Sequence, residues 1–224
     1  MKPTAHYQLD SIQIGKPQSY SQTNPRSNKI EKWTTSFSKT SVKRWVDVTV
    51  NGIAGDEQAD KANHGGFDKA LLMYSSNHFK YWQKQLGVSS IAAGAFGENL
   101  TVSGLDESNV CLGDQLSIND VLLEVSQPRQ PCWKLARHWH LYELPKLVVK
   151  TGYCGWYCRV IKKGQFKPET PIVRATNPHP EWSIRRAHQV FHQSPVNTGE
   201  LDELLSLAVL STACKTSTKR EDDN

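Results

Sequence analysis

The sequence predicts a mainly β fold with some α structure: a β-barrel or strongly bent sheet, followed by a small helical domain. Short apolar stretches, several of them alternating with polar residues, recur between turns rich in Gly, Asn and Asp, as in closed or bent sheets. After the Asn-Pro-His-Pro sequence at 177–180, the apolar residues take the spacing of amphipathic helices. We therefore expect a β domain at 1–176 and a helical domain at 177–224.

The expected strands are places where branched apolar residues alternate with polar ones or form short runs. They lie at 42–50, 70–74, 116–118, 123–125, 156–160 and just before 172–173. Asn119-Asp120 has hairpin spacing between two of them. By contrast, Ser, Thr, Asn and Lys dominate residues 19–41, which predicts an excursion from the barrel or a poorly ordered loop.

Helices are expected where an N-cap residue precedes an amphipathic segment. One starts at Ser75 or Ser76 and ends at Gly87. Two more, capped by Ser183 and Thr198, belong to the C-terminal domain. Few apolar residues follow Leu210, so that domain is expected to be short or incomplete.

The composition excludes several classes of protein. A net charge of +5 without a basic stripe does not favour nucleic-acid binding. No apolar run reaches the roughly 18 residues of a membrane span, and the first ten residues lack a secretory signal, so we expect a cytoplasmic protein. Five cysteines, an odd number at irregular spacing, do not predict a disulfide framework.

Cys132 is the first candidate functional residue. Pro128 and Pro131 stiffen the approach to it, and Arg129 and Lys134 lie close in sequence. Nearby cations favour the thiolate, which is the form that attacks electrophiles or binds metals. A buried structural cysteine is the plainer interpretation of this segment taken alone.

Two other segments contain candidate site residues. In the loop 55–69, Gly65-Gly66 permits a close approach of backbone to ligand, while His64 offers a donor or acid and the loop's lysines, Lys61 and Lys69, offer cations. Glu98 and Asn99 precede a strand and either orient a loop or face a ligand. His138 and His140 are weak candidates for zinc without a third ligand, and Cys132 with His64 could form a cysteine-hydrolase pair.

Taken together, four motifs in order resemble a MOSC domain of the YiiM type across about residues 42–176. They lie at 55–60, 64–70, 96–100 and 127–135, and the helical tail resembles the small three-helix domain of that type. The resemblance implies a β-barrel-like fold that holds the molybdenum cofactor, with the thiolate of Cys132 as a ligand of molybdenum. A soft thiolate suits such a site. The resemblance further implies the residues that hold the pterin and its phosphate: Lys61, His64, Gly65, Gly66, Asn99, Arg129 and Lys134.

By the same resemblance, the chain is expected to be an oxidoreductase. It would reduce small N-hydroxylated compounds, such as N-hydroxylated nucleobases or amidoximes, with Glu98 or His64 donating protons. Electrons would come from a separate reductase, because the sequence has neither a cysteine set for an iron–sulfur cluster nor a nucleotide-binding glycine motif. A homodimer is compatible with the sequence. Two alternatives stay open: a non-catalytic carrier of molybdopterin or of sulfur on Cys132, and a cysteine hydrolase.

Overall fold

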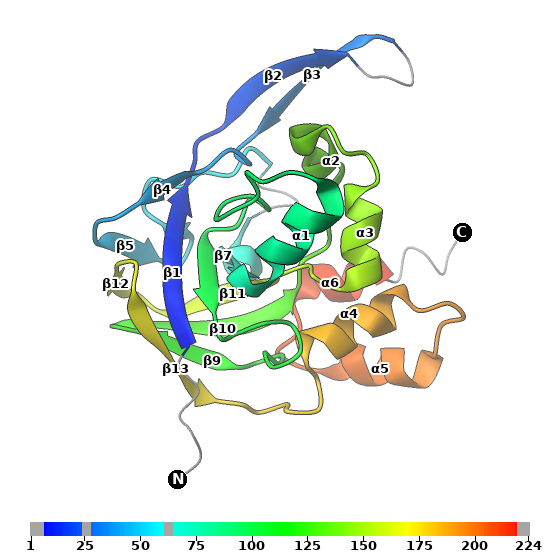
Figure 1. Ribbon diagram of the computed structural model, residues 1–224. Coiled ribbons are helices and arrows are strands. Elements are labelled where there is room, and N and C mark those ends of the chain that lie inside the picture. The colour runs from blue at the N-terminus through cyan, green and yellow to red at the C-terminus, as the bar shows by residue number, and fades with distance from the viewer. Residues whose placement is uncertain (1–6, 24–27, 61–64, 219–224) are drawn as a thin grey trace.

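The computed structural model describes residues 7–23, 28–60 and 65–218. Within these residues, seven strands close into a barrel in the order β13-β9-β10-β11-β7-β8-β1, and β1 pairs back with β13 (Figure 1). β7 and β8 are parallel, whereas the other neighbours in this ring are antiparallel. The barrel strands are β1 Tyr7–Ile14, β7 Leu71–Ser75, β8 Leu100–Ser103, β9 Gln115–Ile118, β10 Val121–Pro128, β11 Trp156–Lys162 and β13 Thr170–Thr176. The expected mainly β barrel fold is therefore confirmed.

Smaller strands extend the barrel at its edges. β4, Thr40–Val42, pairs with the end of β1. β12, Gly164–Phe166, pairs with β5, Val46–Thr49, which in turn pairs with β6, Gly52–Ile53. The predicted strand at 42–50 is thus divided between β4 and β5, with a break at 43–45.

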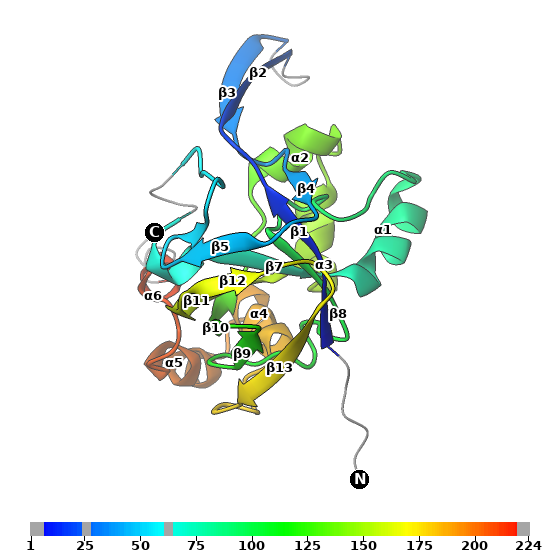
Figure 2. The same ribbon diagram turned by 90° about the vertical axis from the view of Figure 1, so that its left-hand side faces the viewer.

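The polar stretch at 19–41 is not a loop. It folds as a hairpin of β2, Gln18–Thr23, and β3, Ile30–Thr35, which projects away from the barrel (Figures 1 and 2). Polar residues suit these strands because most of their side chains face solvent. Composition predicted the excursion correctly but not its regular structure.

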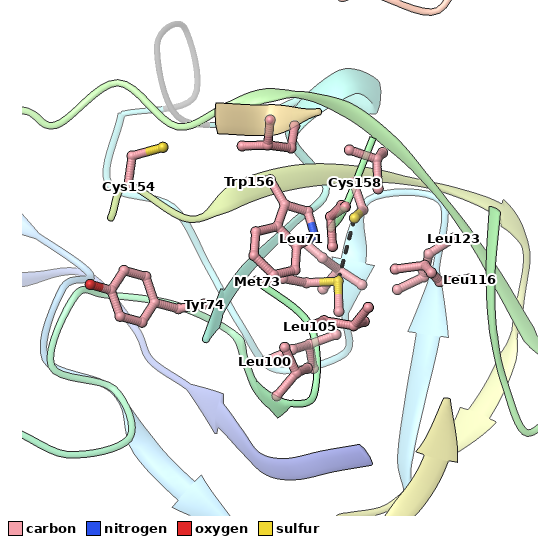
Figure 3. Packing of buried hydrophobic residues seen from close by; sticks show 14 of the residues in the cluster. Leu71, Met73, Tyr74, Leu100, Leu105, Leu116, Leu123, Cys154, Trp156 and Cys158 are labelled. Carbon is pink, nitrogen blue, oxygen red and sulfur yellow. Dashed lines mark hydrogen bonds between the residues drawn. The ribbon is translucent and has the colours of Figure 1, made fainter. Parts of the chain in front are cut away.

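The core fills the barrel and continues beneath the helices. β7 is buried along its whole length, since its two faces lie against the barrel interior and against helix α1, Phe79–Leu86. Trp82 of α1 donates its indole N–H to the Tyr74 hydroxyl at 2.7 Å. Inside the barrel, Cys158 packs its sulfur 3.4 Å from that of Met73, beside Trp156 (Figure 3). These residues fix the strands that lead to the site.

Two helices were not expected from the sequence. Between β10 and β11 the chain forms α2, Trp133–Trp139, and α3, Leu144–Thr151. His138 and His140 therefore lie at the end of a helix, with His140 as its left-handed C-cap, and not on a strand. Helix α1 also begins later than predicted, because the turn η2, Ser76–His78, precedes it.

Three helices follow β13: α4 Ile184–His192, α5 Thr198–Ser206 and α6 Thr212–Thr218. Ser183 caps α4 as expected, accepting a hydrogen bond from the Arg186 amide at 3.1 Å. α5 is capped by Asn197, one residue before the predicted Thr198. α6 is a third helix, as the resemblance to a three-helix domain implied, although few apolar residues follow Leu210 and local patterning did not predict it. Within the described residues, no helix is long and apolar enough to span a membrane.

Candidate functional site

A cleft opens on the barrel where four loop segments meet. Its empty volume is ≈ 650 Å³, counted out to the open mouth. The walls are formed by residues within four segments, 35–39, 56–60, 96–99 (without Glu98) and 129–134, together with Lys69, Leu72 and Tyr157. Of the residues predicted to form the site, Asn99, Arg129, Cys132 and Lys134 lie together in these walls.

Cys132 lies in the cleft wall because strand β10 ends at Pro128, four residues before it, next to the cleft. After Pro128, the Arg129 amide donates to the Gly155 carbonyl at 3.0 Å, which keeps the chain beside β11. Cys132 then stands as the N-cap residue of α2 in extended conformation. All five cysteines are in the described part of the chain; the other four are buried and none forms a disulfide. Burial raises the pKa of Cys154, Cys158 and Cys214, whereas Cys132 is half-buried and lines the cleft.

Arg129 is almost fully buried in the cleft wall, with 4% of its surface exposed. Its Nη2 donates weakly to the Phe96 carbonyl at 3.4 Å, and its Nη1 has no hydrogen-bond partner among the described residues. A buried guanidinium without an acceptor is costly. A ligand that brings an anionic or carbonyl oxygen to Nη1 would remove that cost.

Asn99 belongs to a second polar group. Its Nδ2 donates to Asp56 Oδ2 at 2.9 Å, and its Oδ1 accepts from the Leu72 amide at 3.2 Å. Asp56 also accepts from the Gly15 amide at 2.8 Å and forms a short ion pair with Lys39. The ion pair is nearly enclosed, with 6% of the Lys39 side chain and 3% of the Asp56 side chain exposed. Both residues line the cleft, and sequence reasoning missed both as site residues.

Two further lysines, Lys69 and Lys134, line the cleft. Lys69 Nζ lies 5.9 Å from the centroid of the Tyr157 ring, and burial lowers the pKa of the lysine. Lys134 Nζ lies 5.7 Å from the Trp133 ring. The cleft therefore collects four cationic side chains around one thiol, while Asp56 and Asp60 supply carboxylates.

Other predicted site residues lie elsewhere. Glu98 is fully buried outside the residues that line the cleft; its carboxylate accepts from the amides of Gly94 and Phe96 at 2.6 and 3.0 Å. Burial raises the pKa of this carboxyl, and the Thr101 hydroxyl donates to it at 3.0 Å. The position of Glu98 suits holding the turn at 94–97.

The glycine pair lies next to the cleft but not in its walls. Gly66 is exposed with a φ of +85°, and an added Cβ would meet no atom within 4 Å. Lys61 and His64 fall outside the described residues. Their predicted roles, and that of Gly65, stay predictions.

The donor set of the cleft fits the expected cofactor, a pterin bearing a phosphate and a sulfur-bound metal. Cys132 offers a soft sulfur ligand, and the unpartnered Nη1 of Arg129 offers a donor for a phosphate or a pterin carbonyl. Among the described residues, no group of three His, Cys, Asp or Glu side chains could hold a metal ion by itself.

Comparisons with known proteins agree with this architecture. A family model described as "MOSC domain" matches residues 60–175, more than half of the chain. The uncharacterized protein YflK of Bacillus subtilis is 36% identical over 97% of this chain and 95% of its own length. Protein YiiM of Escherichia coli is 34% identical over 92% of this chain and 88% of its own length.

A comparison with solved structures also finds YiiM proteins. The crystal structure of YiiM from Geobacillus stearothermophilus has a TM-score of 0.79 and 34% sequence identity, covering 96% of this chain and 98% of that one.

A longer protein also matches by sequence. A protein of Gibberella moniliformis named "Reductase" is 34% identical over 72% of this chain, although the match spans only 29% of that longer protein. Fold, motifs and full-length relatives together show that the chain belongs to the MOSC domain family, in its YiiM type.

Proposed function

We propose that this protein is a molybdenum-cofactor-dependent reductase that removes oxygen from N-hydroxylated compounds. One observation carries the proposal: the half-buried thiol of Cys132 faces the same cleft as the buried, unpartnered Nη1 of Arg129. MOSC domains are generally associated with the molybdenum cofactor, and a longer relative is named a reductase. Both facts support an oxidoreductase role.

In this proposal, Cys132 holds the metal and the cations hold the rest of the cofactor. Arg129, Lys69 and Lys134 surround the cleft with donors for phosphate and pterin oxygens. When bound, the cofactor supplies a two-electron redox centre, so that an N–OH compound, two electrons and two protons give the amine or amidine and water.

The remaining wall residues orient and shield the reacting group. Phe37 and Phe96 add apolar surface to the cleft walls, which would limit the water around a bound ligand. Asn99 is held by Asp56 and the Leu72 amide, so its amide is fixed before any ligand arrives.

The proton donor predicted from the sequence is His64 or Glu98. His64 lies outside the described residues, and Glu98 would have to act from behind the wall. We propose that a separate reductase supplies the electrons.

The first experiment measures molybdenum in protein made by cells that synthesise the cofactor. Wild type is compared with Cys132→Ser and with Cys111→Ser, a matched change at a buried cysteine outside the cleft. We expect near-stoichiometric molybdenum in wild type and in Cys111→Ser. Cys132→Ser should retain about tenfold less, because a hydroxyl is a poor substitute for a soft sulfur ligand.

Activity is then tested with N-hydroxylated nucleobases and amidoximes, a chemical or enzymatic reductant and a metal-free control. Product formation that depends on both molybdenum and Cys132 supports the reductase. Bound molybdenum without reduction of any such compound would favour the carrier alternative. Full metal content and turnover in Cys132→Ser would refute the assignment of Cys132.

A further inference from the structure

Helix α6 contacts the turn that carries Lys69 into the cleft wall. Residue 68 makes the contact: Asp68 Oδ2 accepts from the Thr212 amide at 3.2 Å, and its Oδ1 accepts from Arg159 Nε at 2.6 Å. Its carbonyl accepts from the Ser126 hydroxyl at 2.6 Å. Lys69, the next residue, lines the cleft. Thus the turn η1, Phe67–Lys69, is bonded to α6 through Asp68 and supplies Lys69 to the cleft wall.

The same C-terminal segment also holds the strand that leads to Arg129. The fully buried Ser211 donates its hydroxyl to Gln127 Oε1 at 2.5 Å, and its amide donates to the Ser126 carbonyl at 3.2 Å. That hydroxyl also accepts from the Cys214 amide at 3.1 Å, inside the first turn of α6. Gln127 lies two residues before Arg129 on the chain.

Charge explains why this support matters for Lys69. The lysine is half-buried, and the desolvation that lowers its pKa makes a buried position costly for its charged form. Holding it against the Tyr157 ring in the cleft therefore needs contacts that fix its backbone. Asp68 provides them through three elements at once: β10, β11 and α6.

We propose that Asp68 and Ser211 are positioning residues through which α6 keeps Lys69 and Arg129 aligned for one anionic ligand group. The C-terminal helices thereby set how tightly the cleft retains its cofactor. This inference rests on the proposed function for the identity of the ligand, a phosphate-bearing pterin. The arrangement itself stands on the contacts given above.

The test compares cofactor release from Asp68→Asn and Ser211→Ala with release from wild type. Loaded proteins are dialysed, and molybdenum and pterin are measured over time by elemental analysis and by fluorescence after oxidation. We expect release about tenfold faster in each variant, the size of effect that follows from losing one hydrogen bond to a charged or buried group. In Asp68→Asn, Arg159 keeps its second partner, Glu124 at 2.8 Å, so the fold should survive.

Asp114→Asn is the matched control. Like Asp68, Asp114 accepts from a backbone amide, that of Cys111 at 3.0 Å, and pairs with an arginine, Arg174 at 3.2 Å. It is fully buried, whereas the Asp68 side chain is 24% exposed, and it does not line the cleft. The variant Asp114→Asn should lower the melting temperature at least as much as Asp68→Asn does, and it should leave the rate of cofactor release unchanged. Equal release from the control and from Asp68→Asn would reduce the effect to lost stability and overturn the inference.

A double variant shows whether Asp68 acts through its neighbour. If it does, the double variant Asp68→Asn with Lys69→Ala should release the cofactor only slightly faster than the faster of the two single variants. The reason is that both changes remove the same contribution, the contact of Lys69 with the ligand. Full additivity would overturn the inference.

Failure of the proposed function gives a different result. In that case, wild type would bind no molybdenum. The test is then the rate of amide hydrogen exchange at residues 65–70 in the cofactor-free protein. Faster exchange in Asp68→Asn but not in Asp114→Asn would support the positioning role, and equal exchange in all three proteins would exclude it.

Discussion

Arg129 is buried, charged and incompletely bonded, a combination that stable proteins seldom keep without a reason. We predict that Arg129→Met leaves the cofactor-free protein as stable as wild type or more so, because an apolar side chain of similar length removes an unpartnered buried charge. Cofactor retention should nevertheless fall by about tenfold, since each charge-assisted hydrogen bond is worth roughly 1.5–3 kcal/mol. Urea unfolding and molybdenum content measure the two effects separately.

Arg159→Met is the control for this prediction. Arg159 is buried to a similar degree but bonds Asp68 and Glu124, so its loss should destabilise the fold by about 3–5 kcal/mol. If Arg129→Met were equally destabilising, Arg129 would serve the fold and not a ligand.

Glu98 gives a prediction about pH. Burial raises the pKa of its carboxyl above the ordinary value of 4.5. The folded state therefore keeps this proton at pH values where the unfolded chain has released it, and the stability that Glu98 contributes falls as the pH rises above 4.5. Compared with Glu98→Gln, wild type should lose free energy of unfolding between pH 4.5 and neutrality, as measured by urea titration at several pH values. A pH-independent difference between the two proteins would contradict the prediction.

At the level of residues, the sequence predicted part of the site and missed part. Cys132, Arg129 and Lys134 could be found because a proline-flanked segment brings them together within six residues. Lys39 could not, because it stands in a polar stretch with nothing to distinguish it from its neighbours. Only the turn that follows β3 brings it to Asp56.

Among the elements, the β2–β3 hairpin has the clearest separate role. Trp33 stacks on Tyr20 with ring centroids 5.1 Å apart and meets Trp133 of α2 edge-on at 5.7 Å. Glu31 forms a short ion pair with Arg137 of the same helix. Residues 35–37, at the end of β3 and just after it, line the cleft, as do Cys132 and Lys134 at the start of α2. The contacts between hairpin and α2 thus join two segments that contribute cleft residues.

We predict that Trp33→Ala loosens this connection without unfolding the barrel. Among the described strands, β2 and β3 pair with each other and with no barrel strand, so the melting temperature should change little. The hairpin should become sensitive to limited proteolysis, and molybdenum should be released faster. Ile30→Ala, at a side chain 74% exposed on the same hairpin, should do neither. Protease resistance equal to wild type would show that the aromatic contacts do not hold the hairpin.

The sequence also predicted some elements better than others. Strands β9, β10 and β11 were recognised because apolar and polar residues alternate along them. α2 was missed because Trp, Lys, Arg and His in seven residues give no clean apolar face, and Cys132 is an unusual N-cap residue. Its shape depends on tertiary contacts, such as the hydrogen bond from Trp139 to the Ala95 carbonyl at 2.7 Å.

In the whole molecule, the helices after β13 share one core with the barrel. Leu201, Leu204, Leu210 and Cys214 belong to the same buried cluster as the barrel residues Leu9, Met73 and Val125. Strands give way to helices near residue 176 (Figure 1), and the buried cluster contains residues from both sides of that point. The division into two domains there stays a prediction. Sequence periodicity marks where strands give way to helices, but it carries no information about which apolar faces meet.

Ring closure through β1 and β13 has a consequence for how the chain is made on the ribosome. Tyr7 of β1 pairs with Ile172 of β13, so the earliest of the described strands cannot close the sheet until the last of them has been made. Until then both strands have open edges that can pair with other chains. Such distant pairing also slows folding. Nascent chains of this protein should therefore depend on protection from aggregation until about residue 176 has left the exit tunnel.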